Sequence, residues 1–534
     1  MTHSPNPLLH RRLSGQAEVA PDRLAIAMAD DTLTYAEAEA DANRLAHLLR
    51  QLGTVDGDRV ALVCPKSPAT IVAMLACLKT GALYVPIDTA TPPARIALIL
   101  RAVEARAIFS VPEAVQLLDA LAAEGVVDAT TPIISLTADE IVGDTVRSVA
   151  SRTEWSALDP SPVDVAVGDD HAAHVLFTSG STGVPKGVVI THANVATFVD
   201  WAVRYFRIGP DDRLSGHTPF HFDLSTLDIY GTITSGASLH LVPPQTSIVP
   251  QKMAAFIRDT ALTQWFSVPS VLSYLAKFDT VAEGDFPELR RVLWCGEVLP
   301  VPTLIHWMQR LPHVQFTNLY GPTEATIASS YYTVPECPRS ESEQVPIGVA
   351  CDGEELVVLD GGVEAEPKAT GEIYIGGVGL SPGYWRDPDK TASVFVADPR
   401  PGRDGERLYR TGDLGWRDED GVVHFIGRAD TQVKTRGYRV ELGEIEVALD
   451  SIEALRESAV VGVPSEGFEG TAICCAFVSG EGELGPADIR SELSKKVPTY
   501  MIPSRWQSFD ALPRNANGKV DRPHLRQMFE QQAR

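Results

Sequence analysis

The sequence Phe177-Thr178-Ser179-Gly180-Ser181-Thr182-Gly183-Val184-Pro185-Lys186-Gly187 directly follows the apolar run Ala172–Phe177. It contains four hydroxyl side chains, three glycines and one lysine. Glycine lets a backbone turn its N–H groups toward an anion, and hydroxyls and an ammonium add further donors, so this composition suits a polyphosphate. It is not a Walker A loop, because a proline precedes Lys186 and no Ser or Thr follows it. A flexible surface turn is the alternative interpretation.

The length and charge of the chain narrow the class of protein. With 534 residues it is too long for one ordinary core, so we expect two or more domains. Its net charge of −24 argues against a nucleic-acid partner, whose phosphates would be repelled. A bound triphosphate must therefore be met by local positive groups.

The cysteines and the N-terminus indicate a compartment. Seven cysteines without a metal-like cluster suggest a reducing environment, and Cys474 and Cys475 are expected to be buried in a strand within 472–478. No apolar segment typical of a signal peptide follows the first residues, and no apolar run is long enough to span a membrane. We expect a cytoplasmic protein that does not bind membranes.

Alternating helical and strand patterns fill the first half of the chain. They predict a helix over 36–52 ending at Gly53, strands at 59–64, 83–87 and 107–110, and a helix that begins after Ser67 and runs to Lys79. Residues 123–170 show only weak hydrophobic periodicity, and we expect them to form a peripheral segment. The alternation indicates an α/β protein whose large N-terminal domain consists of stacked, mostly parallel sheets with helices.

The pattern changes near residue 430. Strands at 459–463 and 472–478 and a helix over 486–496 predict a small α+β domain of roughly a hundred residues, a size that can fold independently. We therefore divide the chain into an N-terminal domain, 1–429, and a C-terminal domain, 430–534.

Several segments, taken together and in this order, resemble one family. They are 33–35, 78–88, 177–187, Phe222-Asp223-Leu224-Ser225, Asn318–Glu324, 371–377, Tyr409–Asp413, 427–446, 498–503 and Asn517–Arg522, and Leu293–Pro300 is in addition similar to stand-alone alanine- and β-amino-acid-activating enzymes. This set is similar to the adenylate-forming superfamily, which includes acyl-CoA synthetases and luciferases, and most closely to the amino-acid adenylation domains of nonribosomal peptide synthetases. The resemblance covers nearly the whole chain and implies a free-standing adenylation enzyme that uses ATP and Mg²⁺ in natural product biosynthesis.

The resemblance implies roles for the residues of an ATP site. Glu324 matches the magnesium ligand, Tyr320 and Asn318 the adenine contacts, Thr323 the α-phosphate contact, and Asp413 with Arg428 the ribose contacts. The whole set expected to bind ATP is Thr178, Ser179, Gly180, Ser181, Thr182, Gly183, Lys186, Gly296, Asn318, Tyr320, Gly321, Thr323, Asp413 and Arg428. Without the resemblance, Glu324 is equally well read as a helix-entry residue and Asp413 with Arg428 as a solvated pair.

The resemblance also implies an amino-acid site. Asp223 matches the carboxylate that anchors the substrate ammonium; an N-cap aspartate is the structural alternative. The expected substrate pocket consists of Phe222, Asp223, Leu224, Leu227, Val271, Leu293, Cys295, Leu319, Ile327 and Ala328. Apart from Asp223 this lining carries no charge, so we expect a small or medium aliphatic side chain, with the amine on the α or the β carbon.

By the same resemblance, Lys519 is the catalytic lysine of adenylation and Asp430 is the hinge of the mobile C-terminal domain. An isolated lysine or loop aspartate would otherwise have no assigned role. The implied reaction activates an amino acid as aminoacyl-AMP and transfers it to the phosphopantetheine thiol of a separate acyl or peptidyl carrier protein. The alternatives are an acyl- or aryl-CoA ligase of the same superfamily, and an inactive homologue that serves as an assembly subunit.

Overall fold

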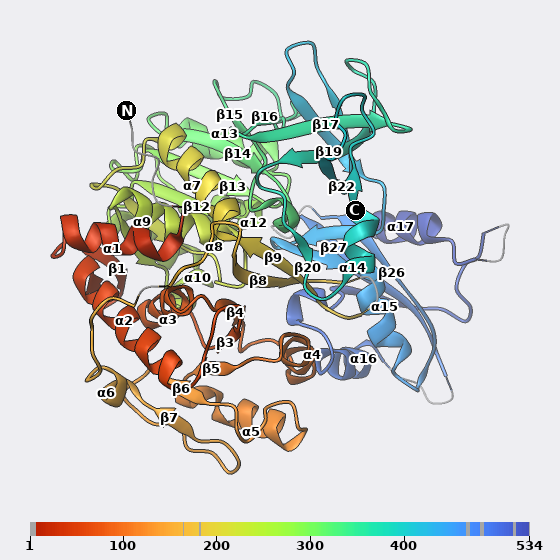
Figure 1. Ribbon diagram of the computed structural model, residues 1–534. Helices are drawn as coiled ribbons and strands as arrows, with labels where there is room; N and C mark the ends of the chain where they lie inside the picture. Colours follow the sequence, from red (N-terminus) through yellow and green to blue (C-terminus); the bar gives the residue numbers. More distant parts are fainter. Residues whose placement is uncertain are drawn as a thin grey trace.

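The computed structural model describes residues 7–163, 165–180, 183–465, 470–480, 485–515 and 519–532. We call 7–429 the large lobe and 430–532 the small lobe. Figure 1 shows the small lobe, in blue, lying against one side of the large lobe, and Glu444 of α15 (Leu442–Asp450) pairs there with Arg95 of α4 (Pro93–Val103).

Three sheets form the framework of the large lobe. The nine-stranded sheet has the order β16 (Val349–Ala350), β15 (Ser330–Thr333), β14 (Gln315–Tyr320), β13 (Arg291–Cys295), β12 (Gln264–Ser267), β10 (Arg213–Gly216), β11 (Ser238–Leu241), β1 (Leu24–Met28) and β2 (Asp31–Thr34). The eight-stranded sheet has the order β20 (Gly383–Tyr384), β9 (Lys186–Thr191), β8 (Ala172–Thr178), β4 (Leu83–Ile87), β3 (Arg59–Val63), β5 (Ala107–Ser110), β6 (Ile133–Ser135) and β7 (Ser148–Ala150). Their central strands pair in parallel, as predicted.

The third sheet is antiparallel. Its order is β18 (Val363–Glu364), β17 (Glu354–Asp360), β19 (Gly371–Gly377), β22 (Arg407–Arg417) and β21 (Phe395–Ala397), and β23 (Val423–Arg428) also pairs with β22. Figure 1 shows β17, β19 and β22 beside the small lobe, so this sheet leads the chain from one lobe to the other.

Helices cover the two parallel sheets in layers. The core between the sheets takes buried residues from α1 (Leu9–Val19), α2 (Tyr35–Gln51), α3 (Pro68–Lys79) and α7 (His192–Phe206). On the outer faces lie α4 and α5 (Val115–Ala123) for one sheet, and α11 (Pro250–Asp259), α12 (Pro269–Lys277) and α13 (Val301–Arg310) for the other. This layered α/β architecture confirms the predicted fold class.

Local sequence signals explain where several helices begin. The Ser67 hydroxyl accepts a hydrogen bond from the Thr70 N–H, and Pro68 occupies the first turn of α3. Thr34 and Glu37 form a capping box at the start of α2, and Gly53 follows that helix with a φ of 81°. The weakly patterned stretch 123–170 differs from expectation, since β6 and β7 extend the edge of a sheet and Trp155 of α6 (Arg152–Trp155) is buried.

The small lobe has its own core. Its central sheet is β26 (Leu455–Pro464), β27 (Thr471–Ser479) and β28 (Arg505–Ser508), with α15 and α16 (Pro486–Ser494) on one face and α17 (Arg522–Gln531) on the other. Cys474 and Cys475 are both buried in β27, as predicted. A separate hairpin, β24 (Gln432–Thr435) and β25 (Tyr438–Glu441), lies directly after the linker that follows β23.

No helix among the described residues combines the length and the hydropathy needed to cross a bilayer. The large lobe also contains several short elements, and η4 (Thr499–Met501) is a short element of the small lobe. Those of the large lobe are η1 (Pro112–Ala114), α8 (Leu224–Thr226), η2 (Leu227–Gly231), α9 (Thr232–Ser235), α10 (Pro244–Ser247), η3 (Thr323–Ala325) and α14 (Pro388–Val394).

Candidate active site

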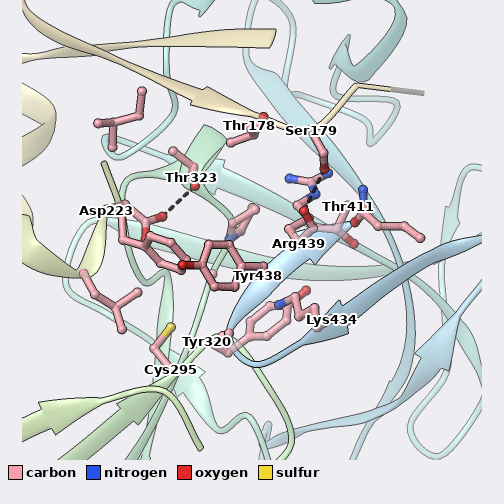
Figure 2. Close-up of a pocket in the computed structure, with 18 of the residues that line it drawn as sticks. Thr178, Ser179, Asp223, Cys295, Tyr320, Thr323, Thr411, Lys434, Tyr438 and Arg439 are labelled. Atoms are coloured by element: carbon pink, nitrogen blue, oxygen red, sulfur yellow. Dashed lines mark hydrogen bonds between the residues drawn. The ribbon is translucent and has the colours of Figure 1, made fainter. Parts of the chain in front are cut away.

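A cleft between the lobes gathers most of the predicted site residues. Most come from the carboxyl ends of β13 and β14, the loop after β10, and the turn between β8 and β9, an edge where α/β sheets commonly bind ligands. Asp413 and Arg428 come from β22 and β23 of the antiparallel sheet. Figure 2 shows these side chains converging on one cavity of about 110 Å³. The predicted residues in its lining are Thr178, Ser179, Phe222, Asp223, Leu224, Cys295, Gly296, Tyr320, Gly321, Thr323, Asp413 and Arg428.

A second cavity of about 920 Å³ adjoins the first. Gly296, Tyr320, Asp413 and Arg428 line both, while Asn318, Leu319 and Asp430 line only the larger one. The residues predicted for adenine and ribose therefore face a wide opening. Those predicted for the amino acid face a space smaller than the roughly 300–1,000 Å³ of typical ligand pockets.

The ribose candidates form a connected hydrogen-bond network. Asp413 accepts a hydrogen bond from the Tyr320 hydroxyl at 2.6 Å and another from Arg428 Nη1 at 2.5 Å. Arg428 also forms a two-point ion pair with Asp430, with distances of 2.7 Å and 2.6 Å. A carboxylate can accept about four hydrogen bonds, so Asp413 retains acceptor capacity for two hydroxyls. Asn318 donates to the Pro346 carbonyl at 2.8 Å.

The predicted phosphate loop is the turn of an antiparallel hairpin, since Thr178 of β8 pairs with Lys186 of β9. Gly180 is required sterically, because a Cβ there would lie 2.0 Å from the Val184 carbonyl oxygen. Gly183 has a φ of 80°, which favours glycine. Ser181 and Thr182 lie outside the described residues.

The small lobe supplies the partners of this loop. The Ser179 hydroxyl donates to the Arg439 carbonyl at 2.7 Å, and the Gly180 N–H donates to Glu444 Oε2 at 3.2 Å. Lys186 Nζ lies 3.4 Å from Glu441 Oε1. The predicted phosphate donors are therefore engaged by the β24–β25 hairpin and the start of α15.

Glu324 is fully buried and has a partner on each carboxylate oxygen. Oε1 accepts a hydrogen bond from Tyr384 at 2.7 Å, and Oε2 pairs with Arg439 Nη1 at 2.7 Å. Burial by itself would raise the pKa of Glu324, but the Arg439 guanidinium and the Tyr384 hydroxyl outweigh it, so the pKa is lowered. A buried, ionised carboxylate is a suitable ligand for a hard cation such as Mg²⁺, but Arg439 has to withdraw first.

Asp223 lines the inner end of the small cavity. Its Oδ2 accepts a hydrogen bond from the Thr323 hydroxyl at 2.7 Å, and its side chain does not cap α8. Burial raises the pKa of Asp223 to about 6, against the opposing effects of Thr323 and the Lys434 ammonium. A carboxylate in such a place gains from a cationic partner.

Six residues predicted for the substrate pocket do not line the small cavity. Leu227, Val271, Leu293, Leu319, Ile327 and Ala328 are absent from its lining, although Leu319 lines the larger one. Apart from Val271, which is partly buried, all are at most 1% exposed. They belong to the apolar core behind Asp223.

Lys519 lies away from the site. Its side chain is exposed, it lines neither cavity, and its backbone N–H donates to Asn515 Oδ1 at 3.1 Å. Its predicted partners in adenylation, the α-phosphate and the substrate carboxylate, would lie in the cleft. The arrangement described here thus has the hairpin, not Lys519, in that position.

Residues of the small lobe complete the small cavity, and the sequence reasoning did not assign them to the site. They are Gln432, Lys434, Gly437, Tyr438, Arg439 and Tyr500. The Gly437 N–H donates to Glu297 at 2.8 Å, and a Cβ on Gly437 would lie 2.5 Å from Val268, so glycine permits the hairpin to approach this closely. Most of these residues lie within 427–446, one of the segments that resemble the family. That resemblance was the signal in the sequence that could have assigned them to the site.

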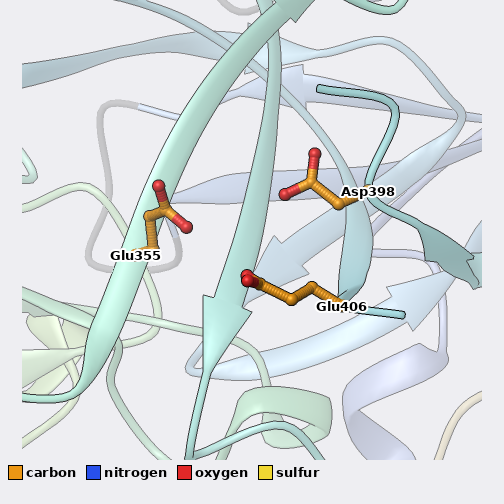
Figure 3. Close-up of side chains that lie close together, drawn as sticks. All are labelled: Glu355, Asp398 and Glu406. Atoms are coloured by element: carbon orange, nitrogen blue, oxygen red, sulfur yellow. The ribbon is translucent and has the colours of Figure 1, made fainter. Parts of the chain in front are cut away.

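A group of carboxylates that lines neither cavity is neutralised by arginines and does not require a metal ion. Glu355, Asp398 and Glu406 lie close together in Figure 3. Arg400 forms a forked pair with Glu355 at 2.7 Å and 2.9 Å and pairs with Asp398 at 2.6 Å, and Arg403 pairs with Glu406 at 3.0 Å. These arginines neutralise the cluster within the antiparallel sheet.

Matches to known proteins cover most of the chain. A family model described as AMP-binding enzyme matches residues 13–385, and one described as AMP-binding enzyme C-terminal domain matches residues 444–519. The chain is 35% identical over 502 residues to the L-proline--[L-prolyl-carrier protein] ligase of Streptomyces coelicolor, covering 92% of this chain and 91% of that protein.

Other relatives are much longer. The chain is 37% identical over 512 residues to a dimodular nonribosomal peptide synthase of Bacillus subtilis, covering 96% of this chain but 20% of that protein. It spans 8% and 19% of two further synthases. Among solved structures, the adenylation domain AlmE of Vibrio cholerae, in complex with glycyl-adenosine-5'-phosphate, matches with a TM-score of 0.83 and 26% identity over 99% of both chains.

Proposed function

This chain belongs to the AMP-binding enzyme family of adenylate-forming ligases, and from that premise we propose that it activates an amino acid and loads it onto a carrier protein. The proposal rests mainly on the position of Asp223. This carboxylate lines the cavity and accepts a hydrogen bond from Thr323, the residue predicted to contact the α-phosphate. A fatty or aromatic acid has no cation to match this carboxylate, whereas an amino acid has one.

Two chemical steps follow from this assignment. In the first, a carboxylate oxygen of the substrate attacks the α-phosphorus of ATP, the bond to the β-phosphate oxygen breaks, and pyrophosphate leaves. In the second, a thiolate attacks the carbonyl carbon of the aminoacyl-AMP, and AMP leaves with the electron pair of the broken C–O bond. Both steps depend on holding reactants in line and neutralising charge.

The chain's residues divide the work of the first step. Asp223 would hold the ammonium, Thr178–Lys186 the β- and γ-phosphates, Asp413 and Arg428 the ribose, and Lys519 the charge that develops around the α-phosphate. Glu324 would ligate Mg²⁺, which when bound neutralises and orients the phosphates. In the present arrangement Arg439 Nη1 lies 2.7 Å from Glu324 Oε2, where the metal ion would bind. This contact supports assigning the arrangement to a stage after pyrophosphate has left.

The second step is assigned to the arrangement in which the hairpin is docked. Lys519 is exposed and Lys434, Tyr438 and Arg439 line the cavity, which supports a rotation of the small lobe between the two steps. Asp430 lies in the linker between β23 and β24, where a few residues can absorb such a rotation. The proposed partner is a separate acyl or peptidyl carrier protein bearing phosphopantetheine.

The proposal is tested by ATP–pyrophosphate exchange with panels of amino, fatty and aryl acids. Exchange that depends on an amino acid, followed by loading of radiolabel onto a phosphopantetheinylated carrier, is the expected result. Exchange with only fatty or aryl acids identifies an acyl-CoA or aryl-CoA ligase. If none of the acids supports exchange, the protein is an inactive homologue.

A further inference from the structure

The predicted side-chain pocket behind Asp223 is filled by the protein itself. Leu227 and Leu293 are 0% exposed, and Leu319, Ile327 and Ala328 are each 1% exposed. They pack in one core cluster together with Leu224 and Cys295. Of this cluster, Leu224, Cys295 and Tyr320 line the small cavity, whereas Leu227, Leu293, Leu319, Ile327 and Ala328 do not, so the cavity does not extend to them.

The backbone behind these residues is fixed by several contacts. Thr326 and Ile327 have φ values of 55° and 71°, a left-handed conformation that is costly for β-branched residues. The Thr326 hydroxyl donates to the Gly379 carbonyl at 2.7 Å, and Cys295 Sγ lies 3.7 Å from the Ile327 carbonyl oxygen. Such a turn persists only where its surroundings hold it, so this wall resists displacement by a larger ligand.

The turn that carries Leu227 is also held in place. Leu227 begins the π-helical turn η2, whose Asp228 accepts a hydrogen bond from Thr218 at 3.1 Å. Tyr230 of the same turn lies 3.0 Å from the Tyr84 hydroxyl. The pocket therefore cannot widen by moving one flexible side chain.

We propose that the substrate is an amino acid whose side chain is no larger than a methyl group, the class that contains glycine, alanine and β-alanine, and that Leu227 and Cys295 set this limit. The inference rests on the proposed function, and it narrows the range expected from the sequence. Extra methylenes forced into a close-packed core displace side chains and backbone, and the resulting penalty excludes larger substrates.

Pyrophosphate exchange with glycine, alanine, β-alanine, 2-aminobutyrate, valine and leucine tests the limit. For the wild type, we expect kcat/KM to fall by about tenfold or more from the best small substrate to valine, since one methylene changes discrimination by roughly 10- to 200-fold. Leu227→Ala and, separately, Cys295→Gly should raise the valine-to-alanine ratio. Leu304→Ala, a comparable truncation in the α13 core, is the matched control and should not change that ratio.

A wild-type optimum at 2-aminobutyrate or any larger side chain would overturn this inference while leaving amino-acid activation intact. An unchanged substrate ratio in both pocket variants would overturn the roles of Leu227 and Cys295. Absence of exchange with every amino acid would instead remove the proposed function on which the inference rests.

The contacts of the small lobe carry a second, independent observation. Two of its carboxylates engage the donors predicted for phosphate: Glu444 accepts from the Gly180 N–H at 3.2 Å, and Glu441 lies 3.4 Å from Lys186 Nζ. One of its cations, Arg439, pairs at 2.7 Å with Glu324, the predicted metal ligand. Glu444 is itself held by the buried Arg95 of α4.

From this pattern we infer that the docked small lobe and magnesium pyrophosphate compete for the same groups. The lobe presents two anions where phosphate oxygens would bind and one cation where the metal would bind. Docking of the lobe therefore displaces the product of the first step. This inference also rests on the proposed phosphate site.

The test is calorimetric titration of the full chain with magnesium pyrophosphate in the absence of nucleotide. Glu441→Gln, which weakens docking at a partly exposed pair, should lower the dissociation constant severalfold, and Glu441→Gln/Glu444→Gln should lower it further. Glu457→Gln is the matched control, because Glu457 pairs with Arg514 within the small lobe at 2.9 Å.

An unchanged or larger dissociation constant in Glu441→Gln, while the wild type binds pyrophosphate, would overturn the competition. If no version binds magnesium pyrophosphate, the phosphate-site assignment fails and the competition fails with it. X-ray scattering supplies a readout that does not depend on affinity, since the wild-type profile should change on addition of magnesium pyrophosphate and remain unchanged with magnesium alone.

Discussion

The two ends of the cleft are built differently. At the amino-acid end, Asp223 and the apolar wall behind it belong to one lobe and are packed into its largest core. At the phosphate end, Ser179, Gly180 and Lys186 contact a different lobe through hydrogen bonds and ion pairs. Close packing fixes a shape, whereas charge pairs can exchange partners without repacking a core. Substrate choice is thus assigned to the rigid end and the change of reaction step to the exchangeable end.

Removal of Lys519 should have the largest effect, and it should affect only the exchangeable end. Lys519→Ala is expected to lower adenylation by about 100- to 1,000-fold, the loss typical of removing one electrostatic donor. Transfer from a preformed aminoacyl-AMP should remain within a few fold, because this step forms no new bond to phosphorus and is assigned to the arrangement in which Lys519 lies away from the cleft. Pyrophosphate exchange and single-turnover transfer measure the two steps, and equal losses in both would contradict the division of roles.

Asp223→Asn probes the rigid end. Loss of one partner of a buried charge pair costs about 2 kcal/mol or more, so the KM for the amino acid should rise about 30-fold or more while the KM for ATP changes little. Since the pKa of Asp223 is raised to about 6, the wild-type KM for the amino acid should also rise as the pH falls below 6. Asp223→Asn should lose this pH dependence. An equal rise in both KM values would place the ammonium elsewhere.

Asp430→Pro tests whether the exchangeable end depends on rotation. Proline fixes φ near −65°, which should restrict the linker to a subset of its conformations. Carrier loading is then expected to fall by about tenfold or more, in proportion to the lost competent population, while pyrophosphate exchange is retained. Asp430→Ala removes the same ion pair with Arg428 without fixing φ and serves as the control. Wild-type loading by Asp430→Pro would show that rotation does not occur there.

Taken per side chain, the smallest expected effect is on stability, and it distinguishes the lobes. Burial lowers the pKa of His10 to about 2, of His174, His192 and His217 to about 3, and of His240 to about 4, and all five lie in the large lobe. The unfolded chain binds protons below pH 6.5 that the folded chain cannot, so stability is complete above 6.5 and is lost as pH falls toward 4. Each histidine contributes up to about 1.4 kcal/mol of this loss at pH 5.5.

Differential scanning calorimetry between pH 7.5 and 5 checks this prediction. The transition of the large lobe should shift to lower temperature below pH 6.5, and that of the small lobe should shift less. A single pH-independent Tm over this range would contradict the burial of these histidines as neutral side chains.

The sequence predicted what local patterns determine. The cap at Ser67, the strand before Thr178 and the buried Cys474–Cys475 pair all follow from periodicity and capping rules, and the structure has them. The sequence did not predict that Arg439 pairs with Glu324, because that contact joins residues 115 positions apart across two lobes. It also did not predict the filled pocket, since the volume behind Asp223 depends on how Leu227 and Ile327 pack, not on their hydrophobicity.

Arg428 ties the sugar site to the linker. Its planar guanidinium donates to Asp413 on one side and, through two N–H groups, to Asp430 on the other. A planar group cannot turn toward a bound ribose without changing its geometry to the linker carboxylate. The two equilibria are therefore thermodynamically linked, and linkage is reciprocal: a lobe orientation that changes nucleotide affinity tenfold is itself shifted tenfold when the nucleotide binds.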